Sequence, residues 1–270
     1  MNRRRALTVF AGAFCARGFA ETAALPLRKR VEAYNGSGDW QPVTLEQRVD
    51  FEKSAIIVCD LWDKHWCRGA TERVNELAAK MAPVLDQARK RGVLIIHAPS
   101  ETMEFYKDAP QRLAIAHMER ISPPSALALD SPPLPIDDSR GGCDTGDSFY
   151  KAWSREHPSI VIGPNDLISD NGAEVYSALK LRGINTLFVM GVHANMCILN
   201  RSFAIKQMTK WGIRCILVRD LTDAMYNPAD RPYVTHARGT ELVVEHIERY
   251  WCPTTTASDL LRGFAAAKSN

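Results

Sequence analysis

Five short apolar runs recur along the chain, and each is apolar on both faces. They cover residues 55–59, 93–96, 159–162, 186–190 and 215–218. Runs of this kind are typical of strands in a buried parallel sheet. Helical spacing of apolar residues occupies the intervals 72–91, 172–181, 197–211 and 233–250. The alternation predicts an α/β fold with a doubly wound, mostly parallel sheet of five or six strands, flanked by helices in a Rossmann-like three-layer arrangement.

One connection breaks this rhythm. Residues 98–158 separate the second and third runs, whereas such connections usually take roughly 2–6 residues. A helix is expected at 110–120, followed by a stretch rich in proline and glycine. The insertion is interpreted as a lid or an oligomer contact, with a solvated loop as the alternative.

The 270 residues suit one large domain, because no linker divides the apolar runs. We predict the domain at 51–252, a lead-in at 25–50 and a C-terminal tail at 253–270. At the N-terminus, Arg3-Arg4-Arg5 precedes an apolar stretch and small residues. This pattern favours a twin-arginine-like export signal over 1–24 and a periplasmic location. The alternative is an N-terminal arm on a cytoplasmic protein.

Charge and cysteine usage narrow the choice of partners. The 34 Lys and Arg against 31 Asp and Glu leave a formal charge of +3, which favours neither nucleic acid nor a membrane surface. A small-molecule substrate is therefore expected, with no membrane partner after signal removal. The seven cysteines show no regular disulfide or zinc spacing. Cys67 and Cys143 both fall in predicted loops and could pair in an oxidising compartment, but the sequence leaves the connectivity open.

Two residues with reactive side chains follow predicted strands. Asp60 ends the first strand, and Cys197 opens the helical pattern after the fourth. In parallel sheets the ligand crevice lies beyond the carboxyl ends of the strands, and the N-terminus of a helix favours a thiolate. Each residue alone also has a structural explanation, Asp60 as a cap and Cys197 as a small buried side chain.

These segments, an apolar strand followed by Asp60 and Gly191-Val192 followed four residues later by Cys197, resemble the signatures of the isochorismatase-like cysteine hydrolases, which include nicotinamidases. The similarity covers residues 51–250. The resemblance implies that Cys197 attacks a carbonyl, that Asp60 takes and returns its proton, and that backbone N–H groups near Cys197 hold the oxyanion. It also implies a cis peptide between Val192 and His193, and a homo-oligomer. Isochorismatases proper lack the cysteine, so an amidase-like activity is favoured.

The chain departs from the family at two places. The family places a catalytic lysine after the third strand, where this sequence has Gly163. Lys64 or Lys151 could supply the cation, although a solvated surface position is the favoured interpretation of each. The metal-binding spacing of nicotinamidases is also missing after the second strand. We therefore expect no metal and no cofactor.

Several aromatic and polar residues near the predicted strand ends are candidates for substrate contact, although each could also be a core or hydrogen-bonded structural residue. They are Trp62, His65, Trp66, His97, Tyr106 and Asn195. The leading hypothesis is metal-independent hydrolysis of a small amide by Cys197 and Asp60. A second is a non-catalytic ligand-binding protein that lost the lysine, and a third is an Asp60-dependent hydrolase of a non-amide bond with a structural Cys197.

Overall fold

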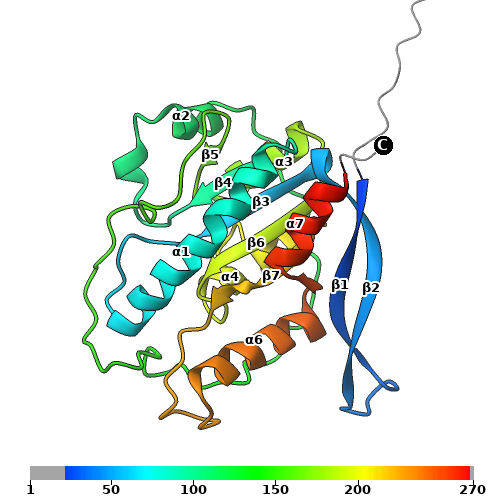
Figure 1. The fold of residues 1–270 in the computed structure, drawn as a ribbon, viewed down its shortest axis with the longest axis vertical. Helices are drawn as coiled ribbons and strands as arrows, with labels where there is room; N and C mark the ends of the chain where they lie inside the picture. Colours follow the sequence, from blue (N-terminus) through cyan, green and yellow to red (C-terminus); the bar gives the residue numbers. More distant parts are fainter. Residues whose placement is uncertain (1–21, 268–270) are drawn as a thin grey trace, which may run out of the picture.

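The computed structural model describes residues 22–267, which form one eight-stranded sheet with the strand order β2-β1-β8-β7-β6-β3-β4-β5 (Figure 1). Strands β3 to β8 run parallel to one another, and β1 pairs antiparallel with both β2 and β8. The strands are β1 (Thr22–Glu32), β2 (Trp40–Asp50), β3 (Ser54–Cys59), β4 (Leu94–Ala98), β5 (Leu167–Ile168), β6 (Thr186–Val192), β7 (Arg214–Asp223) and β8 (Thr254–Thr255).

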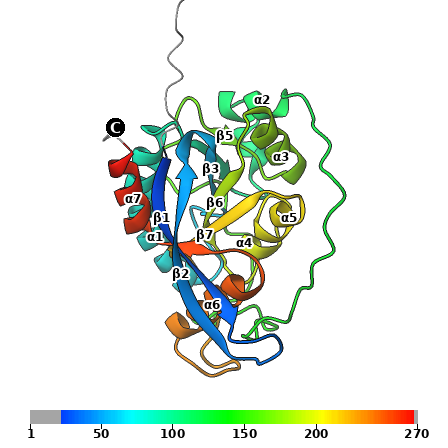
Figure 2. The same ribbon diagram turned by 90° about the vertical axis from the view of Figure 1, so that its right-hand side faces the viewer.

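Helices cover both faces of the sheet (Figure 2). Alternate residues of β3 point to opposite faces, so Ile56 and Val58 pack toward α1 and α7, while Ala55 and Ile57 join the core formed with α3, α5 and α6. The helices are α1 (Arg68–Arg89), α2 (Pro110–Ala116), α3 (Gly172–Leu181), α4 (Cys197–Asn200), α5 (Ile205–Lys210), α6 (His236–Tyr250) and α7 (Ala257–Ala266), with 3-10 helices η1 (Phe51–Lys53) and η2 (Met103–Tyr106). The α/β architecture predicted from the sequence is confirmed.

The third predicted strand is wrong. Residues 159–162 are not a strand, and the strand beside β4 is β5. Ile160 is buried in the core, but Val161 is largely exposed, so this run lacks the two buried faces of a sheet strand. The correction moves the position that follows the strand from Gly163 to Ser169. Neither residue is a lysine.

The sheet also exceeds the predicted five or six strands. The predicted lead-in contributes the β1–β2 hairpin, and the predicted tail contributes β8 and α7. Charged and polar residues occupy much of β1 and β2, because this edge of the sheet is partly solvated. The predicted export signal lies outside the described residues except for 22–24, which begin β1.

The helix predicted at 197–211 is interrupted. α4 ends at Asn200, α5 begins at Ile205, and residues 201–204 form turns between them. The helix predicted at 110–120 also ends early, at Ala116. Within residues 22–267, no helix is long and apolar enough to cross a membrane.

The long insertion is tied to the start of α1. Cys67 and Cys143 form a disulfide with a Cα–Cα distance of 5.6 Å. Around it, Asp147 accepts a hydrogen bond from the Arg68 backbone N–H at 2.8 Å, and Asp144 pairs with Arg73. The insertion is therefore anchored beside the carboxyl ends of the strands.

Candidate functional site

Asp60 and Cys197 lie beyond the carboxyl ends of β3 and β6, which are paired neighbours in the sheet. Gly191 makes this close approach possible, because a Cβ at that position would collide with the carbonyl oxygen of Cys59. Its φ of 115° also favours glycine. Asp60 has a φ of 46°, a left-handed conformation that aspartate tolerates better than most residues. The local sequence thus suits the sharp turns on which both side chains are presented.

The Asp60 carboxyl is fully buried and hydrogen-bonded on both oxygens. Oδ1 accepts from the Ser100 backbone N–H at 2.7 Å, and Oδ2 accepts from Nε of Arg201 at 3.0 Å. The Cys197 thiol lies close enough to this carboxylate to lower its pKa. Burial raises the pKa of Asp60, while Arg201 and the hydrogen bonds oppose that rise. Asp60 is thus a buried carboxylate that interacts with a neighbouring thiol.

The Cys197 thiol is held in its neutral form. Burial is the main cause of its raised pKa, the Asp60 carboxylate adds to the effect, and Arg201 opposes it. Burial therefore outweighs the stabilisation of a thiolate that was expected from a helix N-terminus. That stabilisation is weak here, since α4 has only four residues and its dipole is small. Within the described chain, the Cys197 backbone N–H has no hydrogen-bond acceptor. The peptide between Val192 and His193 is cis, as the resemblance implied.

Arg201 was missed by the sequence analysis. It directly follows α4, and its guanidinium contacts Asp60 and, at 3.3 Å, the carboxylate of Glu101. Its side chain is 31% exposed, so the cation faces both the buried carboxylate and the solvent side. Burial would lower its pKa, but Asp60 and Cys197 outweigh that effect and raise it. Its position four residues after Cys197, on the same face of a helical turn, was the available signal.

The two lysines considered from the sequence are elsewhere. Lys64 places Nζ over the ring of Tyr150, 5.6 Å from its centroid. Lys151 donates to the backbone carbonyl of Glu101, the residue whose carboxylate pairs with Arg201, at 3.0 Å. The cationic side chain beside Asp60 and Cys197 is therefore that of Arg201 and not that of either lysine.

Aromatic residues from the turn after β3 and from the insertion cluster beside the strand ends. Trp62 stacks on Trp153 with ring centroids 4.3 Å apart, and His65 lies edge-to-face with His193 at 5.0 Å. Trp66 contacts the exposed Phe149. Burial is the main cause that lowers the pKa of His65 to about 4 and of His193 to about 3. Both imidazoles are thus neutral at physiological pH.

His97 and Tyr106 are buried and do not face an open site. Nδ1 of His97 lies 2.7 Å from Glu156, and Nε2 lies 3.0 Å from Asp166. Burial by itself would lower the pKa of His97, but the two carboxylates raise it to about 9. The Tyr106 hydroxyl accepts from the backbone N–H of Glu156 at 2.9 Å. These contacts give both residues the structural role that was the alternative to substrate contact.

Asn195 supports the turn that carries Cys197. Its amide donates to Asp138 at 2.7 Å and to the Met225 carbonyl, and accepts from the Met225 N–H at 2.8 Å. An open pocket of about 430 Å³ lies beside this turn. Its lining consists of Leu134, Asp138, Asn195, Met196, Cys197, Asn200 and Arg201. The candidate nucleophile and the candidate cation therefore border the same pocket.

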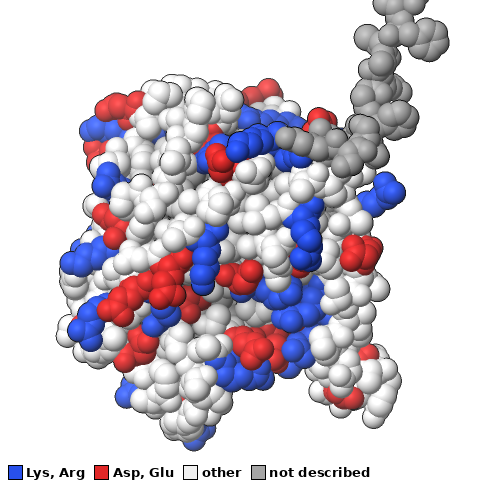
Figure 3. Space-filling model, in the orientation of Figure 1, with Lys and Arg blue, Asp and Glu red and all other residues white. Residues whose placement is uncertain are grey.

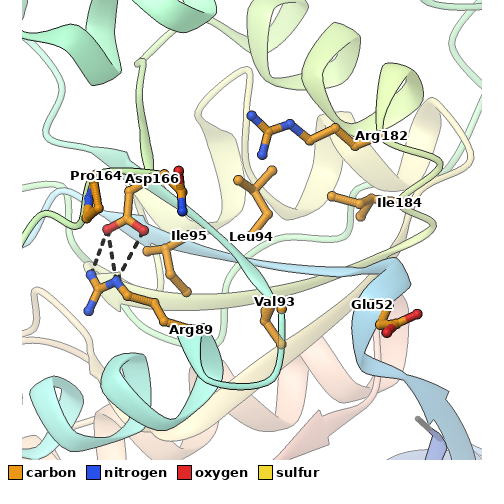
Figure 4. Close-up of a pocket in the computed structure, with 11 residues that line it drawn as sticks. Glu52, Arg89, Val93, Leu94, Ile95, Pro164, Asp166, Arg182 and Ile184 are labelled. Carbon is orange, nitrogen blue, oxygen red and sulfur yellow. Dashed lines mark hydrogen bonds and ion pairs between the residues drawn. The ribbon is translucent and has the colours of Figure 1, made fainter. Parts of the chain in front are cut away.

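A second pocket, of about 410 Å³, lies at the opposite, amino ends of the strands (Figure 4). Figure 4 shows Asp166 held by Arg89, while the Arg182 guanidinium lies apart from them. The lining contains no cysteine, serine or histidine. On the molecular face shown in Figure 3, acidic and basic side chains are interspersed, in keeping with the small net charge.

One group of potential metal ligands is found among residues 22–267, formed by Cys67, Cys143 and Asp144. The two sulfur atoms are joined in the disulfide, and Asp144 forms an ion pair with Arg73 at 2.6 Å. The ligand atoms are therefore already engaged, and this group does not fit a metal in the disulfide-bonded state.

Comparisons with known proteins found no matching family model and no matching curated protein. Solved structures do match. A cysteine hydrolase from Pseudomonas syringae pv. phaseolicola 1448A is 15% identical with a TM-score of 0.52, covering 81% of this chain and 95% of that one. An isochorismatase from Pseudomonas putida KT2440 is 16% identical with a TM-score of 0.48, covering 78% and 91%. An isochorismatase family protein from Burkholderia thailandensis is 15% identical with a TM-score of 0.47, covering 79% and 96%. The chain thus has the isochorismatase-like α/β fold, as the resemblance of its sequence motifs implied.

Proposed function

We propose that this protein is a metal-independent cysteine hydrolase that cleaves the C–N bond of a small amide. The observation that carries the proposal is the contact among the Cys197 thiol, the buried Asp60 carboxylate and the Arg201 guanidinium at the edge of an open pocket. A nucleophile hydrogen-bonded to a base, which is oriented by a third group, is the general arrangement for covalent catalysis. Hydrolytic chemistry agrees with the name of the cysteine hydrolase that shares the fold.

The neutral thiol decides the first step. Because the pKa of Cys197 is raised, the thiol must lose its proton as it attacks, and the Asp60 carboxylate is in position to accept it. Sγ then forms a bond to the amide carbonyl carbon, and the carbonyl oxygen becomes an oxyanion. The free backbone N–H of Cys197 is a suitable donor to that oxygen.

Asp60 then returns the proton to the leaving nitrogen, the C–N bond breaks, and an amine or ammonia departs. The thioester on Cys197 is hydrolysed by water, with Asp60 again taking a proton, and the carboxylic acid leaves as the thiol is restored. Arg201 favours the ionised form of Asp60 and opposes the rise in the thiol pKa. It supplies the positive charge that the lysine supplies in the family.

The proposal is tested by incubating the full chain with a panel of small amides and measuring released ammonia or amine. Acid quenching during turnover, followed by mass spectrometry, should find an acyl adduct on Cys197. We expect Cys197→Ala to abolish release and the adduct, while Cys215→Ala, which removes a buried thiol on β7, should keep both.

Two other results would replace the proposal. Nearly unchanged turnover by Cys197→Ser would mean an Asp60-dependent hydrolase with a structural cysteine. Ligand-induced thermal stabilisation without turnover across the panel would support a binding protein.

A further inference from the structure

The outer edge of the β1–β2 hairpin is an unpaired strand. β2 runs for 11 residues at one end of the sheet, and among residues 22–267 it pairs with β1 alone (Figure 1). Most of its side chains are exposed, and Leu45 is 58% exposed. A long edge strand offers a row of free backbone N–H and C=O groups, which makes it a template for pairing with another strand.

Two local features limit which part of this edge can pair. Pro42 has no N–H to donate, and the chain leaves the strand at Phe51, where η1 begins. The usable segment is therefore 43–50. Consider a second copy whose β2 pairs antiparallel with this one about a twofold axis perpendicular to the sheet. Directly opposed residues of an antiparallel pair have their side chains on the same face of the sheet, so the axis must pass through a residue and not between two residues.

The side chains discriminate among the possible centres. An axis at Glu46 places glutamate against glutamate, and an axis at Arg48 places arginine against arginine. An axis at Leu45 brings Pro42 into the paired region, opposite Arg48. An axis at Gln47 keeps Pro42 outside and places Glu46 of each copy opposite Arg48 of the other, giving two opposite-charge pairs by symmetry.

The same register buries apolar surface. Leu45 of each copy faces Val49 of the other, and Val49 belongs to the core that also contains Leu260 and Phe264 of α7. The exposed Leu45 side chain would therefore lie at the margin of an existing core. In the described residues, Glu46 makes no ion pair, and Arg48 makes only an exposed hydrogen bond to Thr22 at 3.3 Å, so both charges are available.

We propose that β2 is the contact surface for a second copy of this chain, paired antiparallel about Gln47 to give one continuous sheet through two subunits. The candidate active site lies at the strand ends and contributes no residue to this contact. The inference is therefore independent of the proposed function.

The test exchanges the charges of Glu46 and Arg48. The dimer Kd of each full-length variant is measured by sedimentation velocity over a concentration series. The unmodified protein should be a dimer. Glu46→Arg and Arg48→Glu should each create two like-charge pairs and raise the dimer Kd about tenfold or more. The double variant Glu46→Arg/Arg48→Glu restores opposite charges and should return the Kd toward the original value.

A matched control is Glu76→Arg, which makes the same charge change at an exposed position on α1. It should leave the dimer unchanged. Thermal melts of all variants verify that the fold is intact. A monomeric unmodified protein, a dimer indifferent to the single exchanges, or a double variant no better than the singles would each overturn the inference.

Discussion

Two pockets of nearly equal volume lie at opposite edges of the same sheet, yet their chemistry differs. The carboxyl-edge pocket, of about 430 Å³, borders Cys197 and Arg201, which contacts the buried Asp60. The amino-edge pocket, of about 410 Å³, borders Arg89 and Asp166, whose charges are satisfied by each other and by His97.

The comparison shows that volume does not identify a reactive site. At the carboxyl edge, a carboxylate, a thiol and a cation meet where a ligand can enter. From the amino-edge pocket, buried charges run along β4 as a closed structural cluster, from Arg89 through Asp166 to His97, the fourth residue of β4, and Glu156. Substitutions at the first edge should affect catalysis, and substitutions in the closed cluster should affect stability.

The largest expected effect is from Asp60→Asn. The amide keeps the shape of the side chain but cannot take the thiol proton, so kcat should fall by about 10⁴-fold. Steady-state kinetics on the best amide substrate would measure the loss. A variant that keeps more than a tenth of the activity, with a normal melting temperature, would remove Asp60 from the mechanism.

Arg201→Ala should lower kcat by about 10²–10³-fold, because the positive charge beside Asp60 and Cys197 is lost. Arg201→Lys should recover part of that loss. Alkylation of Cys197 by iodoacetamide should also be slower in Arg201→Ala at a given pH, since the thiol pKa rises further. Arg182→Ala, at the amino-edge pocket, is the matched control and should leave both measurements unchanged. Equal losses in the two variants would contradict the distinction between the edges.

His97→Leu should mainly destabilise the fold. It leaves Glu156 and Asp166 buried without their shared cation, at a cost of about 3 kcal/mol in the free energy of unfolding. Urea titration followed by circular dichroism would measure this cost. Little change in stability would mean that the cluster is not the structural element inferred here.

The same cluster predicts a pH dependence. The folded pKa of His97 is raised to about 9 from an ordinary value near 6.5. Its stabilising contribution should therefore be complete below about pH 6.5 and decline as the pH rises through about 9. The difference in stability between the unmodified protein and His97→Leu should shrink over that interval. A constant difference would show that His97 does not titrate there.

The sequence was sufficient to place Asp60 and Cys197 at the carboxyl ends of two predicted strands. Buried strands require apolar residues on both faces, so the local sequence was enough to predict strands at 55–59 and 186–190. The polar residues that follow these strands therefore had to lie at the carboxyl edge of the sheet. The strand predicted at 159–162 was wrong because an apolar sequence does not reveal that Val161 faces solvent. The hairpin was not predicted because its two strands are partly solvated and carry charged residues, so neither forms a continuous apolar run.

The order of apolar and polar residues thus determined the fold class and the positions of the two candidate residues, Asp60 and Cys197, because strand periodicity is a local property. Only the tertiary structure decided that Arg201 is the cation beside Asp60 and that His97 lies enclosed between two carboxylates. Those pairings join residues 141, 59 and 69 positions apart. The distances between these charged groups are set by the packing of the whole chain and not by a local sequence pattern. The same packing buries the groups, which strengthens their interactions.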